Sequence, residues 1–147
     1  MHITRHDLAN QPIPQLAVAT CFIEVDHKLL FLQRASQEQA PCQWAIPGGK
    51  IEALESPLEG MMREVREETG IHLLARSIDE LGGYMVKHPK GDYALYLFRC
   101  AFMDKPKVVL NQDEHRAYEW IGINKEDIGA LDLIAGQLEV IKKVYSL

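Results

Sequence analysis

The chain has 147 residues, of which 47% are hydrophobic and 25% are charged. This length and apolar content exclude a mainly disordered protein and allow a buried core without disulfide bonds. The 16 lysines and arginines are outnumbered by 21 aspartates and glutamates, which gives a net charge of −5. Because duplex nucleic acid rewards clustered positive charge, we expect no duplex partner. An anionic small substrate is still compatible with this charge if a metal ion accompanies it.

The chain also lacks signals for membranes and export. Each long apolar run is interrupted by a charge well before the roughly 18 residues of a membrane span, so we expect no membrane partner. The first residues lack the apolar stretch of a secretory signal, which predicts a cytoplasmic protein. Cys21, Cys42 and Cys100 cannot all pair, so we expect inert free thiols. Without repeats or linkers, residues 1–147 are predicted to form a single domain, with residues 1–14 as an extended lead-in.

The first half of the chain predicts strands. Residues 16–25 are rich in β-branched and aromatic side chains and predict a buried strand. After a turn at residues 26–28, residues 29–33 predict the returning strand of a hairpin. Residues 44–46 predict a short strand that stops at residues 47–49, where Pro-Gly-Gly predicts a tight turn.

The clearest helix is predicted from Pro57 to Thr69. Ser56 and Glu59 have the spacing of a capping box, with a proline at the first helical position, and Gly70 is a natural C-terminal stop. Residues at helical spacing predict the face that packs on the core: Leu58, Met61, Met62, Val65 and Thr69.

The remaining elements alternate in type. In chain order we expect strands at 83–87 and 93–103 around a turn at 88–92, a strand at 117–121, a short helix capped by Asn124 and ending near Gly129, and an amphipathic helix at 133–145. Strands, a helix, more strands and a helix predict a mixed α/β or α+β domain.

Three glutamates share one face of the predicted 57–69 helix. Glu64, Glu67 and Glu68 are spaced i, i+3, i+4, opposite the apolar face. Like charges at this spacing cost about 0.2–0.5 kcal/mol per pair, and the C-terminal end of the helix dipole also disfavours anions. A divalent cation explains the cluster, since Mg²⁺ prefers carboxylate oxygens, water and phosphates. The alternative is a solvated face braced by ion pairs of Arg63 with Glu59 and Glu67.

The residues around this helix form a longer motif. Starting at Gly49 the sequence reads G-(x5)-E-(x7)-R-E-V-x-E-E-x-G-I, ending at Ile71. This segment resembles the full Nudix box, and the chain is similar to Nudix hydrolases of the MutT-like superfamily. The resemblance implies a Nudix-type α/β/α sandwich with a mixed β-sheet over about residues 15–145. One departure is Ala53-Leu54, where many relatives have glycine just before the glutamate.

The resemblance assigns roles to the residues of the box. The metal-binding positions correspond to Gly48 (through its carbonyl), Glu64, Glu67 and Glu68, with Glu64 also the candidate general base. It implies that Arg63 orients these carboxylates without touching the substrate. Glu55 is expected to brace the loop against Arg63, the alternative being a solvated charge. Gly49 is expected to let the backbone approach the substrate.

Residues outside the box complete the expected site. The segment E-H-x-x-Y-x-W from Glu114 is similar to one that several Nudix subfamilies place beside the metal cluster, which implies that Glu114 adds a ligand or serves as base. The alternative is a plain loop carboxylate. His115 is expected to be a structural hydrogen-bonding residue. Arg34 resembles an arginine that some relatives turn toward the substrate phosphates, the alternative being a surface cation.

The nucleobase pocket is less defined. Tyr84, Tyr93 and Tyr96 alternate along predicted strands, and one of them is expected to line it.

Together these features predict Mg²⁺-dependent hydrolysis, with Mn²⁺ as a substitute, of the pyrophosphate linkage in a nucleoside diphosphate linked to another moiety. The first expectation is a (d)NTP that gives NMP and pyrophosphate. Nucleotide sugars, ADP-ribose and dinucleoside polyphosphates are the alternative substrates. Two rivals are a non-catalytic nucleotide-binding module and a cation site that only stabilises the fold. The oligomeric state is expected to be a monomer or a homodimer.

Overall fold

The computed structural model describes residues 2–6 and 16–147. The elements in chain order are β1 (His2–His6), β2 (Ala17–Val25), β3 (Lys28–Arg34), β4 (Trp44–Ala45), β5 (Gly48–Lys50), α1 (Pro57–Thr69), η1 (Ala75–Ser77), β6 (Asp79–Lys87), β7 (Tyr93–Ala101), β8 (His115–Gly122), α2 (Lys125–Gly129) and α3 (Gln137–Tyr145). In the described part of the chain, no helix is long and apolar enough to cross a membrane.

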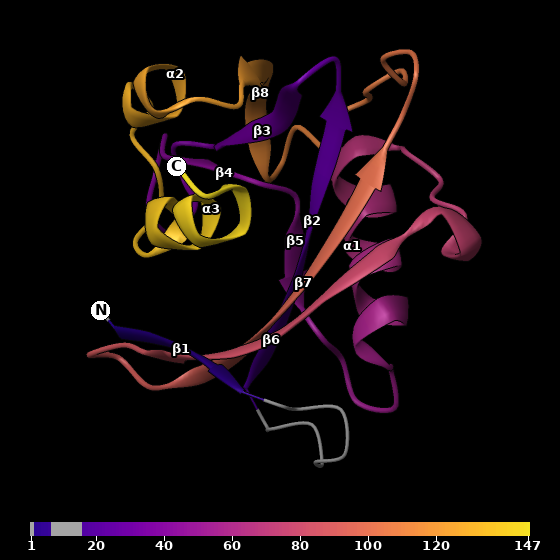
Figure 1. Cartoon of the computed structure of the whole chain (residues 1–147). Coiled ribbons are helices and arrows are strands. Elements are labelled where there is room, and N and C mark those ends of the chain that lie inside the picture. The colour runs from indigo at the N-terminus through magenta and orange to yellow at the C-terminus, as the bar shows by residue number, and fades with distance from the viewer. Residues whose placement is uncertain (1, 7–15) are drawn as a thin grey trace.

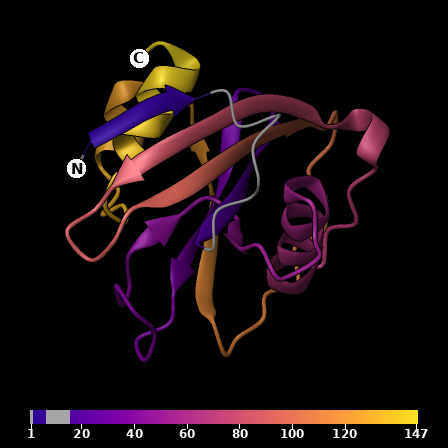
Figure 2. The same ribbon diagram turned by 90° about the horizontal axis from the view of Figure 1, so that it is seen from below.

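The strands form one mixed sheet with helices on both sides. Neighbouring strands run in the order β1-β6-β7-β2-β3-β4, while β5 pairs with β2 and β8 pairs with β3. β2 runs parallel to β7 and antiparallel to β3 and β5. Helix α1 covers one side of the sheet, and α2 and α3 lie on the other (Figures 1 and 2). The predicted α/β/α sandwich with a mixed sheet is therefore confirmed.

The central strand β2 is buried on both faces. Because side chains alternate along a strand, Cys21 and Ile23 pack in the core beneath α1, while Phe22 packs in the core beneath α3. A strand covered on both sides reads as a nearly continuous apolar run, which is why the sequence predicted it well. The hairpin of β2 and β3 is also confirmed.

Helix α1 has the predicted bounds and the predicted ends. The Ser56 side chain accepts from the Glu59 N–H, and the Glu59 side chain accepts from the Ser56 N–H, which completes the capping box. Gly70 ends the helix in the left-handed region with a φ of 72°. Met61 and Val65 are fully buried against the sheet. The helix is thus fixed at both ends as well as along one side.

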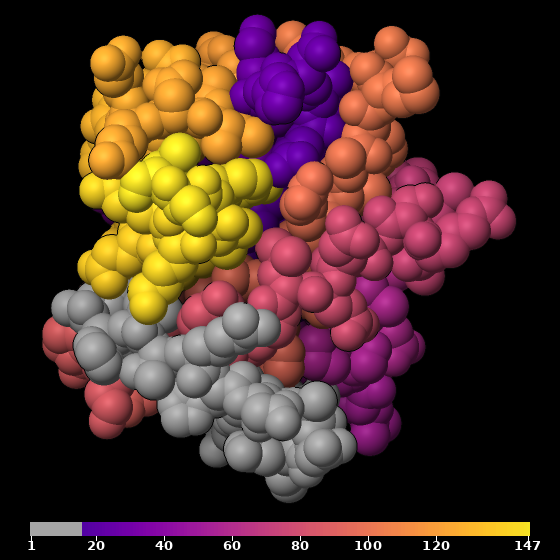
Figure 3. Space-filling view, viewed as in Figure 1, coloured from indigo at the N-terminus to yellow at the C-terminus, as the bar shows by residue number. Residues whose placement is uncertain are grey.

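Helix α3 is attached to the sheet at its C-terminal end. The Tyr145 hydroxyl donates to the Glu24 carboxylate, which also accepts from Arg99 Nε at 3.1 Å. The Tyr145 ring lies edge-on to Phe22, with 5.3 Å between the ring centroids. On the surface, α2 and α3 gather on one face beside the indigo tip of the β2–β3 hairpin (Figure 3). These contacts set the position of the residues at the start of α3.

Several boundaries differ from the prediction. Strand β6 begins at Asp79, where a strand was expected from residue 83, and β7 ends at Ala101, where residue 103 was expected. Strand β8 covers residues 115–122, where residues 117–121 were expected. Residues 48–50 form β5, paired with β2, where a tight turn was expected. Residues 133–136 are not helical, because Gly136 has a φ of 86° and α3 begins only after it. Part of the expected lead-in, residues 2–6, is strand β1 paired with β6, and residues 7–15 lie outside the described residues.

Candidate functional site

A cavity of about 380 Å³ extends between α1 and the start of α3. Carboxylates from α1 and from the start of β8 contribute to its wall, namely Glu64, Glu68 and Glu114. Apolar and aromatic side chains from the sheet and α3 contribute to the rest, including Val18, Val86, Tyr93, Leu95 and Val140. A cavity with acidic groups and an apolar wall has the composition of a site for a polar small molecule with an apolar part.

Glu68 is the buried member of the carboxylate group. Its side chain is only 7% exposed, and its Oε1 accepts from the Gly48 N–H at 2.8 Å. A Cβ on Gly48 would lie 2.3 Å from the Ala19 carbonyl oxygen, so only glycine brings the backbone this close. Burial raises the pKa of Glu68 well above its usual range. The three glutamates were predicted to share one face opposite the apolar stripe, but Glu68 turns inward to the sheet.

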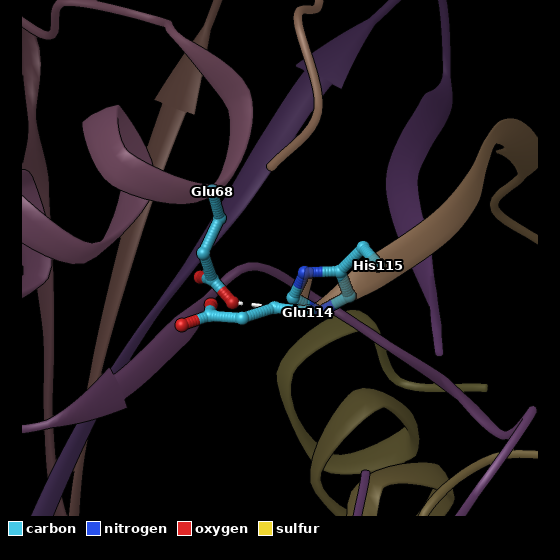
Figure 4. Close-up of side chains that lie close together, drawn as sticks. All are labelled: Glu68, Glu114 and His115. Atoms are coloured by element: carbon cyan, nitrogen blue, oxygen red, sulfur yellow. Dashed lines mark ion pairs between the residues drawn. The ribbon is translucent and has the colours of Figure 1, made fainter. Parts of the chain in front are cut away.

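Glu114 and His115 come to Glu68 from the start of β8, and the three side chains point toward one another (Figure 4). One potential ligand atom from each residue lies within 4.8 Å of the others. His115 Nε2 is 3.5 Å from Glu68 Oε2. Burial lowers the pKa of His115 to about 4, so its imidazole is neutral near pH 7 and leaves the glutamate charges uncompensated. The cluster thus offers carboxylate oxygens and a neutral nitrogen to a cation.

Glu64 lies against the glycine-rich strand β5. A Cβ added to Gly49 would lie 2.5 Å from Glu64 Cδ and within 2.8 Å of both carboxylate oxygens, so the absent side chain makes room for this carboxylate. Burial raises the pKa of Glu64, while the neighbouring Arg63 opposes the shift. A carboxylate with a raised pKa in a cavity can exchange a proton nearer neutral pH than an exposed one.

Arg63 connects the loop before α1 to the carboxylates of α1. Its guanidinium donates two parallel bonds to Glu55, at 2.7 and 3.0 Å, and one to the Lys50 carbonyl at 3.0 Å. It also donates to Glu64 at 3.0 Å and to Glu67 at 3.2 Å. The expected brace between Glu55 and Arg63 is present in the structure.

The surroundings of this arginine differ in two respects from the alternative of a solvated face braced by ion pairs. The Arg63 side chain is 17% exposed and does not lie on an open helix face. Of the two ion pairs expected to brace a solvated face, the one with Glu67 is present, while the Glu59 carboxylate accepts from the Ser56 N–H. The Glu67 side chain is 51% exposed. Glu67 is therefore the most exposed of the three glutamates of α1, with Glu64 at 18% and Glu68 at 7%.

Arg34 contributes to the cavity wall at the end of β3. Its Nε donates to the Gln39 carbonyl at 2.6 Å, and its Nη2 lies 3.9 Å from Glu38. The loop that follows β3 thus holds the guanidinium in the wall of the cavity that Glu64, Glu68 and Glu114 also line. Of the three tyrosines considered, Tyr93 is the one among the residues that line this cavity.

The sequence did not indicate two polar residues of the cavity wall. Thr20 lies on β2, and its hydroxyl is buried without a hydrogen-bond partner among the described residues. Gln137 begins α3 and is 9% exposed. Neither belongs to a motif, and the boundary of α3 was misplaced. Only the cavity brings them together with the box residues.

Comparison with known proteins decides the family. A family model described as the NUDIX domain matches residues 13–144, which is most of the chain. The chain belongs to the Nudix family. A MutT-like protein of Streptomyces ambofaciens is 34% identical over 117 residues, which cover 78% of this chain and 68% of that protein.

Two further comparisons agree with this assignment. The nucleoside triphosphatase NudI of Klebsiella pneumoniae is 31% identical to this Nudix protein over 118 residues, covering 74% of this chain and 81% of that protein. The crystal structure of a MutT protein from Methanosarcina mazei has a TM-score of 0.74 at 25% identity, covering 89% of this chain and 92% of that one. The predictions of a MutT-like Nudix fold and of a Nudix pyrophosphohydrolase are confirmed. Nudix hydrolases use divalent metals and act on small-molecule nucleotides.

Proposed function

We propose that this Nudix hydrolase cleaves nucleoside or deoxynucleoside triphosphates into the monophosphate and pyrophosphate. The observation that carries the proposal is the cluster of Glu68, Glu114 and His115 in the wall of one cavity with Glu64. The apolar part of the same wall gives a nucleoside a place to bind. The similarity to a nucleoside triphosphatase over most of both chains supports this substrate class.

The donor set fits Mg²⁺, with Mn²⁺ as a substitute. Hard carboxylate oxygens are the ligands that Mg²⁺ prefers. The buried carboxyl of Glu68 has the raised pKa of an acid without a compensating charge, which a cation would supply. Gly48 (through its carbonyl), Glu64, Glu67, Glu68 and Glu114 are the proposed ligands. Bound there, the cation would neutralise the phosphate oxygens and lower the pKa of the attacking water.

The protein groups have separate proposed tasks. Glu64 accepts the proton of the attacking water, because its side chain is largely buried in the cavity wall and its pKa is raised. Glu114 is the second candidate for this base. Arg63 holds Glu64 in place through its 3.0 Å bond and does not contact the substrate. Arg34 binds the substrate phosphates from the cavity wall, and the backbone of Gly49, which also lines the cavity, allows them to come close.

The setting of the enzyme is also part of the proposal. Cys21 and Cys100 are buried free thiols and Cys42 is a partly exposed one, which supports a reducing cytoplasm. We propose a single domain over residues 1–147, acting as a monomer or a homodimer on a small-molecule nucleotide and not on duplex nucleic acid.

A substrate panel tests this function. The protein is incubated with Mg²⁺ and eight NTPs and dNTPs, nucleotide sugars, ADP-ribose and dinucleoside polyphosphates, and phosphate and pyrophosphate are measured separately. We expect the fastest reaction with a triphosphate and release of pyrophosphate. A faster reaction with any of the other compounds would move the proposal to that substrate class. No turnover with any compound, together with measurable nucleotide binding, would favour the non-catalytic binding module. A cation that raises the melting temperature without turnover or nucleotide binding would favour a structural site.

A further inference from the structure

The side-chain amide of Gln137 has a fixed orientation in the cavity wall. Its Oε1 accepts a hydrogen bond from the Ile46 backbone N–H at 2.8 Å. Because a backbone N–H only donates, the oxygen of the amide must face Ile46 and the nitrogen must face away from it. Gln137 is nine-tenths buried, and Nε2 has no hydrogen-bond partner within residues 16–147 of the structure. Nε2 is not among the fully buried unpaired atoms of the described residues, so the amide nitrogen reaches the cavity and is free to donate to a molecule bound there.

The amide lies in a mainly apolar part of the wall. Val140 follows Gln137 by one helical turn on α3, and it packs in the same core as Val86 and Leu95 of the sheet. All four residues line the cavity, together with Tyr93. A flat, mostly apolar group with a polar edge suits this surface, since the faces of its ring meet apolar side chains and its edge can meet the amide. A nucleobase has this chemistry.

The carboxylates limit which part of a nucleotide can occupy this position. Glu64 and Glu68 come from α1, on the other side of the sheet from α3 (Figure 1). A nucleotide whose phosphates lie near these residues extends its base away from them, toward Val140 and Gln137. At that end of the cavity the protein offers a hydrogen-bond donor, the Gln137 Nε2, so the nucleobase must present an acceptor.

We propose that Gln137 determines base specificity by donating a hydrogen bond from Nε2 to a carbonyl oxygen of the nucleobase. This inference rests on the proposed function, and it goes further by naming the preferred substrates as triphosphates of cytosine, uracil, thymine or guanine. Adenine has no carbonyl oxygen. Glutamine reads adenine best when it uses both its oxygen and its nitrogen, but here Oε1 faces Ile46.

Two variants distinguish the loss of the Nε2 donor from the loss of the hydrogen bond between Gln137 and the Ile46 N–H. Gln137→Glu keeps an oxygen for the Ile46 N–H and removes the donor, whereas Gln137→Met removes both groups at similar size. We would measure kcat/KM for CTP, UTP, GTP and ATP with the wild type and both variants. The wild type should prefer carbonyl-bearing bases over ATP by about tenfold. Both variants should reduce this ratio to about two or less, mainly through KM. The ratio of kcat/KM values is compared because the negative charge that Gln137→Glu introduces could weaken the binding of all nucleotides equally, and such an effect leaves the ratio unchanged.

Binding of products keeps the test independent of turnover. Calorimetry with CMP, UMP, GMP and AMP should show the same order of affinity in the wild type and its loss in both variants. If no triphosphate is hydrolysed, the proposed function fails, and these affinities still decide the role of Gln137. A wild type that prefers adenine, or variants that retain the wild-type ratios while melting at the wild-type temperature, would overturn the inference. Variants that fail to fold leave the decision to the wild-type order of bases, where equal affinity for all four also overturns it.

Discussion

Replacement of Arg63 by lysine keeps the positive charge and removes the planar guanidinium with its several N–H donors. The guanidinium makes five hydrogen bonds, two of them in parallel to Glu55. The single nitrogen of lysine cannot keep the pair to Glu55 together with the bonds to Glu64 and to the Lys50 carbonyl. Glu55 and Glu64 are each 18% exposed, so their bonds are only partly replaced by water. The bond to Glu67 is discounted, because that side chain is 51% exposed.

The expected losses of stability and of kcat follow from the hydrogen bonds that lysine cannot make. Loss of two charge-assisted bonds, each near the lower end of the usual range, should reduce the free energy of unfolding by about 2–3 kcal/mol. Glu64 also loses its positioning contact, and kcat should fall by about 100-fold with little change in KM. Because Arg63 is mostly buried, stability falls together with activity, which an arginine on an open face would not cause.

Urea unfolding and steady-state kinetics with Mg²⁺ check both numbers. Arg66→Lys is the matched control, since Arg66 lies on the exposed side of the same helix. The control should keep wild-type kcat and stability. An Arg63→Lys enzyme with more than about half of the wild-type kcat would refute the positioning role, because an effect of this network is expected to be near 100-fold.

Three further predictions concern the same site. Gly49→Ala should reduce kcat by about 100-fold or more, because the added Cβ displaces the Glu64 carboxylate. Gly129→Ala is the control and should leave kcat unchanged, because a Cβ at residue 129 has no neighbouring atom within 4 Å. Equal kinetics of the two variants would contradict this prediction. Thr20→Val removes a buried hydroxyl that has no hydrogen-bond partner among the described residues, and it should raise the free energy of unfolding, measured in urea, by about 1 kcal/mol. A clear decrease in this free energy would contradict the prediction, because it would show that the hydroxyl makes a stabilising hydrogen bond. Burial raises the pKa of Glu68, so folding favours its protonated form and, without metal, stability falls as pH rises from the ordinary pKa toward the raised one. Mg²⁺ competes with that proton and should raise the melting temperature more at about pH 8 than at about pH 5.5, and an equal increase would contradict the account.

Helix α1 could be predicted residue by residue because its signals are local. The capping box, the first-turn proline and the terminal glycine each act within one turn, and the structure has all three. The spacing of the Nudix box could likewise be read directly, because a helix converts it into a fixed arrangement in space. Burial of Glu68 could not be read this way, because it depends on Gly48, which a different element brings to it.

Elements that depend on distant partners were harder to predict. Residues 48–50 form a strand only because β2 lies beside them, and strand pairing of this kind leaves little local signal. The start of α3 was misplaced because residues 133–136 are apolar enough to continue the helical pattern, while Gly136 and the contact of Leu133 with Trp44 prevent it. The role inferred for Gln137 depends on that boundary. It therefore could be recognised only from the cavity.

The most direct test of the account is the release of pyrophosphate from the best triphosphate in Mg²⁺ and in EDTA, by the wild type and by Glu64→Gln. The account predicts one NMP per pyrophosphate with the wild type in Mg²⁺, and no release in EDTA. With Glu64→Gln, release should fall by at least about 1,000-fold while NMP binding is retained, because Glu64 is both the proposed base and a proposed metal ligand, and neither role is assigned to binding the nucleoside. Equal release with and without Mg²⁺, or by Glu64→Gln at the wild-type rate, would contradict a metal-dependent pyrophosphohydrolase built on these carboxylates.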